Sequence, residues 1–255
     1  MARKTDYAQI ASAFDRRYQD HRYEGTEQTL RSFVDAGQRV LEVGCGTGHW
    51  LQLLEQWGCD VSGLDPSSQM LEKAAARGLR AELVHGHAES LPFSAASFDR
   101  VLCINAIHHF EDIPRFIGEA RRVLRAGGRL LSIALDPSQG RDRWAIYDYF
   151  APTLELDRKR YPATSLLRTW LADSGFTQCE TLVAQRILSE HGARETLATD
   201  RLAQSSTSQL AILSDDEYAA GIAAIRADLA AAEARGSNLR LISDLHLYAT
   251  FGSVP

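Results

Sequence analysis

The stretch VLEVGCGTGHW, residues 40–50, decides the fold. An apolar run ends at Gly44, Gly46 and Gly48, which alternate with other residues, and a helical pattern begins directly after them. Glycine permits a positive φ and removes Cβ atoms that would hold a ligand away from the backbone. In open α/β sheets, nucleotide-like ligands bind at the carboxyl ends of the strands. The stretch therefore predicts a first strand, a tight turn against a ligand, and a helix.

Strand and helix patterns alternate from about residue 26 to about residue 188. Apolar, β-branched runs predict strands at 39–44, 59–65, 80–86, 98–107 and 129–135. Helical spacing predicts helices at 49–58, 66–78 and 112–128, the second with Ser67 as N-cap and Gly78 just past its end. The near-continuous apolar strands are typical of parallel strands buried on both faces. We therefore expect a doubly wound α/β sheet.

The second half of the chain is less regular. Residues 137–163 read as an irregular, aromatic and charged segment, followed by a helix at 164–175 and a strand at 176–188. A polar stretch covers 189–213. Ser214 and Glu217 predict a capping box for a helix at 214–236, whose apolar face carries Tyr218, Ile222, Ile225 and Leu229. A last strand is expected at 239–252. The expected organisation is one domain, 1–255, with inserts at 137–163 and 189–238.

Composition excludes several function classes. The 255 residues carry a net charge of -5 and no long basic stripe, which argues against nucleic acid as the main partner. No apolar run approaches the roughly 18 residues that a membrane span needs. The N-terminus is charged and has no apolar signal core. The four cysteines are scattered and form no CxxC pair. These features together predict a cytoplasmic protein.

Two ligand classes could use the glycine turn. A dinucleotide fingerprint reads GxGxxG, but His49 stands where its third glycine would be. Asp65 ends the second strand, as an acid that binds ribose hydroxyls would, and this feature suits both classes. GHAESLPFSAASFDRVLCINAIHHFED (86–112) and EARRVLRAGGRLL (119–131) decide between them. Together with the glycine turn, they resemble the class I S-adenosylmethionine (SAM)-dependent methyltransferases, in the group that includes the ubiquinone/menaquinone-biosynthesis C-methyltransferases.

The resemblance implies a Rossmann-like, mostly parallel, seven-stranded sheet, SAM as cofactor, and methyl transfer to a small-molecule acceptor. It also implies roles for residues of the turn. Gly44, Cys45 and Gly46 would present their backbone to the methionine part of SAM. Glu42 would orient the turn or reach the SAM ammonium group, and Asp65 would bind the ribose diol.

The other implied cofactor-binding residues follow the strands, except for Tyr18, which precedes the first strand. They are Ser67 and Met70 beside ribose and adenine, Ala88 and Glu89 at the adenine edge, Asn105 and Ala106 beside the methionine part and methyl group, and Tyr18, which would close over SAM. One position departs from the resembling family, which usually has Asp where this chain has His87. Either His87 replaces the acid toward the adenine amino group, in one neutral tautomer, or backbone and stacking hold the base alone.

His108 and His109 follow the fourth strand and are the candidate catalytic residues. One could act as general base for a protonated nucleophile, or both could pack and hold the loop. With His85 and His87 they could approach one sheet edge. No carboxylate joins these histidines in a ligand-like spacing, so the sequence favours no metal site.

The segment 137–163 is the expected acceptor cap. Its aromatic residues could line a pocket and its arginines could pair an acidic group: Trp144, Tyr147, Tyr149, Phe150, Tyr161, Arg141 and Arg143. The insert 189–238 could form a second cap wall or a homodimer contact. Two other functions stay open, namely a non-catalytic SAM-binding regulatory subunit and, less favoured by the motifs, an NAD(P)-dependent oxidoreductase.

Overall fold

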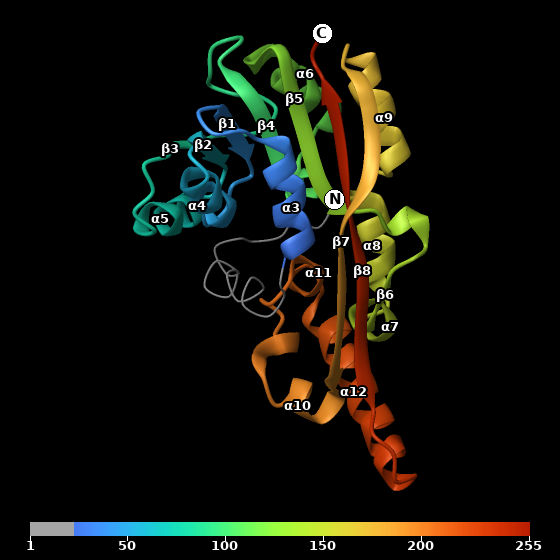
Figure 1. Ribbon diagram of the computed structural model, residues 1–255. Helices are drawn as coiled ribbons and strands as arrows, with labels where there is room; N and C mark the ends of the chain where they lie inside the picture. The colour runs from blue at the N-terminus through green and yellow to red at the C-terminus, as the bar shows by residue number, and fades with distance from the viewer. Residues whose placement is uncertain (1–22) are drawn as a thin grey trace. The chain divides into compact units, whose positions relative to one another are not determined.

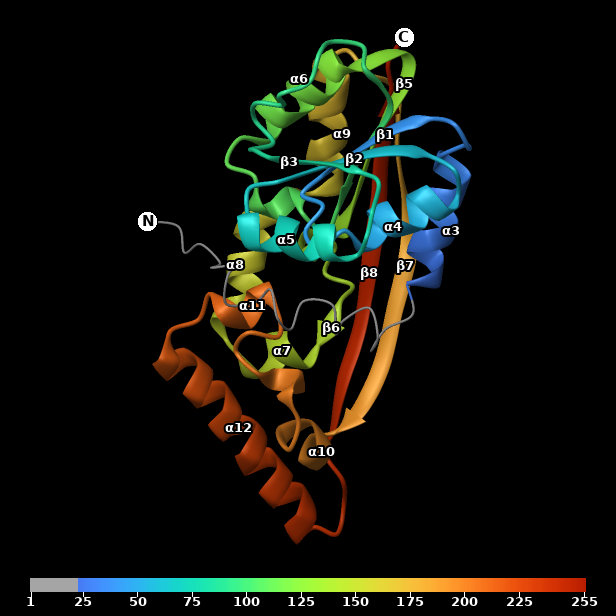
Figure 2. The same cartoon turned by 90° about the vertical axis from the view of Figure 1, so that its left-hand side faces the viewer.

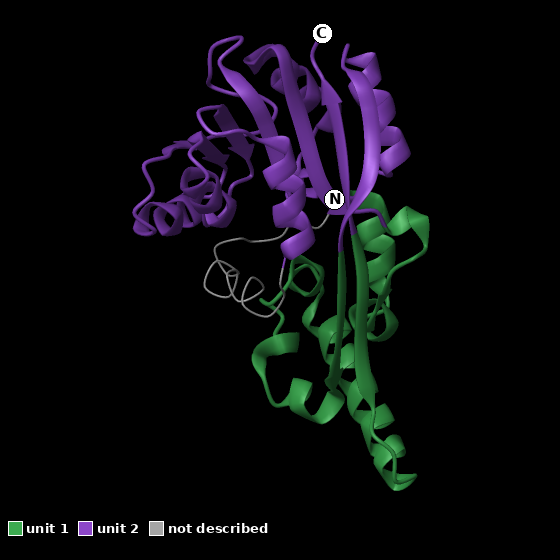
Figure 3. Ribbon diagram, in the orientation of Figure 1, with its two compact units in different colours: residues 1–22, 137–160, 186–246 green, residues 23–136, 161–185, 247–255 purple. Residues whose placement is uncertain are grey.

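The computed structural model describes residues 23–255, in which the chain forms two compact units (Figure 3). Unit 2 contains Tyr23–Asp136, Tyr161–Gln185 and Leu247–Pro255, whereas the described part of unit 1 contains Pro137–Arg160 and Arg186–His246. Unit 1 is therefore built from segments that leave unit 2 and return to it.

Unit 2 is built on a mostly parallel sheet. Its parallel strands are β1 (Arg39–Val43), β2 (Asp60–Asp65), β3 (Glu82–His85), β4 (Phe98–Ile104) and β5 (Leu124–Leu135), in the order β3-β2-β1-β4-β5. The chain runs outward from β1 through β2 to β3 in one direction, and from β4 to β5 in the other. This reversal makes the sheet doubly wound. The predicted Rossmann-like fold class is confirmed.

Helices cover both sides of this sheet. They are α3 (Glu24–Phe33), α4 (His49–Gln56), α5 (Ser68–Ala76), α6 (Ile113–Val123) and α9 (Thr164–Asp173). Figures 1 and 2 show α3 and α4 on one side and α6 and α9 on the other. Ser67 caps α5 through a bond from the Met70 N–H, as predicted, and Asp112 caps α6 in the same way. The buried side of α6 carries Phe116, Ile117, Ala120 and Val123.

Two long strands complete the sheet. These are β7 (Thr177–Gly192) and β8 (Arg240–Ser253), and β8 pairs antiparallel with β5 from Leu135↔Leu247 to Arg129↔Ser253. The earlier part of β8 pairs with the two-residue strand β6 (Arg143–Trp144). Strand β7 pairs with β8. The expected seven strands are present, and β6 is an eighth that the sequence did not predict.

Three segments differ from the sequence-based expectation. The helix expected to continue to Gly128 ends at Val123, because Leu124 already pairs with Phe98 as the start of β5. The segment 137–163 is not irregular. It contains a 3₁₀ turn η2 (Pro137–Gln139), β6, and the helices α7 (Ala145–Tyr149) and α8 (Pro152–Arg160). Short helical pieces also fill 189–213: α10 (Ala193–Leu197), η3 (Asp200–Leu202) and α11 (Ser208–Ala211).

Unit 1 has its own apolar core. The helix α12 (Asp215–Ala234) begins with the predicted capping box between Ser214 and Glu217. Its predicted apolar face packs on a buried cluster that includes Phe150, Leu210 and Leu241. Gly221 lets α12 approach closely, because a Cβ there would overlap the Phe150 ring. Unit 1 is thus stabilised by hydrophobic burial within itself.

A buried carboxylate ties three helices of unit 1 together. Asp157 of α8 is fully buried, and its Oδ2 accepts hydrogen bonds from the Tyr147 hydroxyl at 2.7 Å and the Gln209 amide at 2.9 Å. Its Oδ1 pairs with Arg160. Removing the carboxylate would take a buried acceptor from two hydrogen-bond donors and from a largely buried guanidinium.

We therefore expect Asp157→Ala to lower the free energy of unfolding of unit 1 by about 3–5 kcal/mol, the usual cost of breaking a buried ion pair. Urea titration followed by Trp fluorescence and far-UV circular dichroism measures this. Glu155→Ala is the matched control on the same helix, since the side chain of Glu155 makes an exposed ion pair with Lys159. The control should change stability by less than about 0.5 kcal/mol. Equal effects of the two substitutions would contradict the assigned role of Asp157.

Candidate functional site

The glycine turn after β1 is held against the ends of two other strands. Gly44, Gly46 and Gly48 all have positive φ, at 77°, 53° and 76°. The N–H groups of Gly44 and Cys45 both donate to the Leu64 carbonyl at the end of β2, at 2.7 and 3.1 Å. A Cβ on Gly44 would overlap the Cβ of Ala106, just past β4. The turn therefore needs glycine at position 44 for its conformation and for this close approach.

Asp65, at the end of β2, joins the turn to the next helix. Its Oδ2 accepts the Gly46 N–H at 2.8 Å, and its Oδ1 accepts the Ser67 N–H at 2.9 Å. The residue is 8% exposed, and burial raises the pKa of its carboxyl, opposed by these two backbone hydrogen bonds. A carboxylate has about four acceptor positions, so two remain for ligand hydroxyls.

A second buried acid lies beneath the turn. Glu42, inside β1, is 1% exposed. Burial, followed by the charges of Glu42 and Asp65, holds the pKa of the Cys45 thiol well above its usual range. Burial and then Glu42 likewise raise the pKa of the Cys103 thiol in β4. Both shifts come first from burial, and the buried acids add a smaller contribution in the same direction.

The segment after β3 holds the start of α6. Ala88 is buried, and His87 is exposed. The Glu89 carboxylate accepts the N–H groups of Glu111 and Asp112 through Oε1, at 2.7 and 3.2 Å. Part of the acceptor capacity of Glu89 is thus used structurally, a role that the sequence did not predict.

Three further candidate residues follow β4 along the chain. Asn105 has a positive φ of 51°, and its N–H donates to the Ile133 carbonyl at 2.7 Å. His108 and His109 lie in the short turn η1 (Ile107–His109), with ring centroids 3.7 Å apart. Tyr161 stacks on His108 at 4.0 Å, with its hydroxyl oxygen 3.1 Å from Nε2. This contact places Tyr161, near the end of the 137–163 segment, against the turn η1 in unit 2.

Other predicted residues lie elsewhere. Tyr18 falls outside the described residues. Met70 is 1% exposed on the buried side of α5. The five aromatic residues expected to line one pocket are divided between the two units. Tyr161 is in unit 2, whereas Phe150 belongs to the core of unit 1, and the hydroxyls of Tyr147 and Tyr149 bind Asp157 and Asp228.

The sequence reasoning missed a buried pair in unit 1, Asp142 with His246. These residues are 104 positions apart. No local spacing could have found the pair, because only the return of β8 past β6 brings it together.

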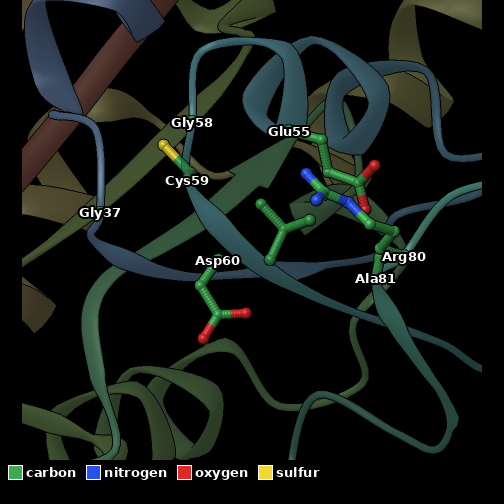
Figure 4. Close-up of a pocket in the computed structure, with 8 residues that line it drawn as sticks. Gly37, Glu55, Gly58, Cys59, Asp60, Arg80 and Ala81 are labelled. Carbon is green, nitrogen blue, oxygen red and sulfur yellow. The ribbon is translucent and has the colours of Figure 1, made fainter.

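A cavity of about 340 Å³ lies at the amino ends of the parallel strands, whereas the glycine turn lies at a carboxyl end (Figure 4). Its lining includes Asp60, which begins β2, whereas Asp65 ends that strand. Gly37, Glu55, Cys59 and Arg80 also line it. Ligands of open α/β sheets bind outside the carboxyl ends of the strands, so this cavity is not the expected ligand site. Among residues 23–255, no cluster of three or more His, Cys, Asp or Glu side chains could hold a metal ion.

Gly44→Ala tests the close approach of the turn. Alanine at this φ costs about 1–2 kcal/mol, and the overlap with Ala106 adds a further cost of about 1–3 kcal/mol. Gly127→Ala is the matched control, since Gly127 has a similar φ of 72° but open space around it. Thermal unfolding monitored by circular dichroism compares the two. A Gly44→Ala protein as stable as the Gly127→Ala protein would contradict the packing described here.

Comparison with known proteins gives consistent results. A family model described as a methyltransferase domain matches residues 41–132. An uncharacterized methyltransferase of Geobacillus thermodenitrificans is 30% identical over 188 residues, which cover 67% of this chain and 84% of that protein. The demethylmenaquinone methyltransferase of Thermotoga maritima is 36% identical over 119 residues, which cover 46% of this chain and 52% of that protein. The chain thus spans about half the length of that relative, and 43% and 41% of two further ones.

The fold is similar to that of solved structures. A putative methyltransferase from an antibiotic biosynthesis pathway of Anabaena variabilis superposes with a TM-score of 0.70 at 21% identity, covering 88% of this chain and 95% of that one. No helix in the described part of the chain is long and apolar enough to cross a membrane.

Proposed function

This chain belongs to the class I SAM-dependent methyltransferases, and from that premise we propose that it transfers a methyl group from SAM to a small-molecule acceptor. One observation carries the proposal. The positive-φ turn at the end of β1 shares a single buried carboxylate with the end of β2, through the Gly46 N–H on Asp65. A nucleoside fits such a junction because bare backbone and an acceptor of ribose hydroxyls lie next to each other.

The proposed cofactor contacts follow from this placement. Gly44, Cys45 and Gly46 would offer backbone to the methionine part, and Asp65 would accept the ribose hydroxyls. Glu42 would orient the turn or reach the ammonium group. Three pairs of residues would complete the site: Ser67 and Met70 near the ribose and adenine, Ala88 and Glu89 with His87 at the adenine edge, and Asn105 and Ala106 beside the methyl group.

SAM supplies an electrophilic methyl group on a sulfonium sulfur. The contribution of the chain is mainly positional, since the acceptor must lie in line with the S–CH₃ bond at about 3–3.5 Å. His108 or His109 would take the proton if the nucleophile starts protonated. The buried acids Glu42 and Asp65 favour a cation at this edge. We assign 137–163 and 189–238 the selection of the acceptor within a single methyltransferase domain.

The acceptor itself stays at the level of a class. The relatives are named for different acceptors, such as demethylmenaquinone and malonyl-[acyl-carrier protein], so their names support methyl transfer but no one substrate. Turnover of SAM to S-adenosylhomocysteine (SAH) with any acceptor separates this function from that of a non-catalytic SAM-binding subunit.

Asp65→Ala should weaken SAM binding by more than tenfold, because the substitution removes charge-assisted hydrogen bonds worth about 1.5–3 kcal/mol each. Isothermal titration calorimetry with SAM, SAH and NAD measures this and separates the oxidoreductase alternative. Asp60→Ala is the matched control at the other end of β2, where Asp60 is exposed. An unchanged dissociation constant for Asp65→Ala, or binding of NAD but not SAM, would refute the assignment.

The affinity for SAM should also depend on pH. The charged carboxylate accepts hydrogen bonds, and protonation removes this capacity, so SAM binding weakens as the pH falls through the pKa of Asp65. Burial raises this pKa, so the loss should begin above the usual Asp value of about 3.9. Titrations between about pH 4.5 and 7 follow the loss. Asp65→Asn should bind weakly with a flat profile, and a wild-type profile that is equally flat would contradict this role.

A further inference from the structure

Unit 1 contains a buried acid held by a histidine. Asp142 lies just before β6, and its side chain is 5% exposed, against 11% for His246 of β8. The Oδ1 atom of Asp142 accepts the backbone N–H of His246 at 2.9 Å and lies 3.1 Å from Nδ1 of the same residue. A proton on Nδ1 makes the second contact a hydrogen bond and leaves Nε2 as the acceptor nitrogen of the ring.

The other oxygen of this carboxylate has no partner. Oδ2 of Asp142 is buried and makes no hydrogen bond within the described part of the chain. A buried carboxylate oxygen without a donor costs free energy, and native structures retain few such atoms. Burial raises the pKa of the Asp142 carboxyl, opposed mainly by its bonds with His246.

A purely structural role does not account for this second oxygen. Fastening the start of β6 to β8 needs one acceptor, and Oδ1 alone receives both His246 contacts. An asparagine would fasten the strands equally well without a buried charge. Arg186 of the neighbouring strand β7 binds both oxygens of Asp244, at 2.7 and 2.8 Å. The Asp142 carboxylate therefore has the capacity to accept one further donor, which reaches Oδ2 once the side chains that enclose this atom move apart.

Aromatic side chains follow Asp142 along the same segment. Trp144, two residues later, meets the Tyr147 ring edge to face with centroids 5.1 Å apart. Trp144 also packs against the apolar core of unit 1, so the segment that follows Asp142 is aromatic and partly buried.

We propose that Asp142, oriented by His246, is a ligand subsite of unit 1 that binds a hydroxyl or ammonium group. Oδ2 accepts an O–H or N–H hydrogen of the ligand, while Oδ1 stays bound to His246. That this ligand is the methyl acceptor rests on the proposed function, but the subsite itself does not. The inference assigns unit 1 a recognition role for a donor-bearing small molecule.

Three probes with one skeleton test the subsite. 2-Phenylethylamine offers an ammonium group, 2-phenylethanol a hydroxyl, and ethylbenzene neither. Each is titrated into the full chain with and without SAH, and the ring resonances of His246 are followed by NMR. We expect saturable shifts with the amine, the alcohol or both, which identifies the donor, and none with ethylbenzene.

Two variants complete the experiment. Asp142→Asn keeps an oxygen for His246 but places an NH₂ group where Oδ2 lies, and it should weaken probe binding at least tenfold. Asp148→Asn, an exposed acid on α7, should bind as the wild type does. Both should bind SAH normally, so loss of SAH binding in every protein counts against the proposed function and not against the subsite. Equal shifts with all three probes, no shifts at all, or unchanged binding in Asp142→Asn would overturn the inference.

Discussion

The candidate site depends on one shared carboxylate. Asp65 binds the N–H of Gly46 in the turn after β1 and the N–H of Ser67 at the cap of α5, so a single side chain sets the position of two strand ends. The turn can meet Asp65 only because Gly44 lacks the Cβ that would collide with Ala106. Backbone conformation, strand order and the ligand-binding acid are therefore one coupled arrangement.

The chain can carry a large second unit because each unit is stabilised by its own contacts. The sheet of unit 2 is fixed by parallel pairing around β1 and by its own helices, and unit 1 buries its own core around Phe150 and Leu241. The first segment of unit 1 leaves directly after Asp136, whose carboxylate accepts two hydrogen bonds from Thr164 of α9. The first inserted segment thus begins just after Asp136 and ends just before Thr164, two positions that are hydrogen-bonded to each other.

Much of the secondary structure in both units could be predicted from the sequence because its signals are local. Glycine spacing located the turn, and the side chains of Ser67, Ser214 and Glu217 marked helix starts that the structure confirms. The predicted end of α6 was wrong, because Leu124 pairs with Phe98 and belongs to β5. The helix α8 was missed because its polar residues show little helical periodicity. Contacts such as Tyr161 with His108, or Asp142 with His246, depend on distant segments and leave no trace in local spacing.

The two ligand classes left open by the glycine turn differ in charge. The pKa of the buried Cys45 thiol, beside the turn, bears on this difference. Besides burial, the charges of Glu42 and Asp65 raise the pKa of Cys45, which means that negative charge is disfavoured there. A dinucleotide would place an anionic pyrophosphate against this backbone, whereas SAM places an ammonium and a sulfonium group near it. Burial makes the largest contribution to this shift, so the thiol indicates chiefly a site shielded from water, and the two acids add a smaller bias against anions. This bias agrees with SAM as the cofactor, which the absence of a third glycine at His49 also favours over NAD.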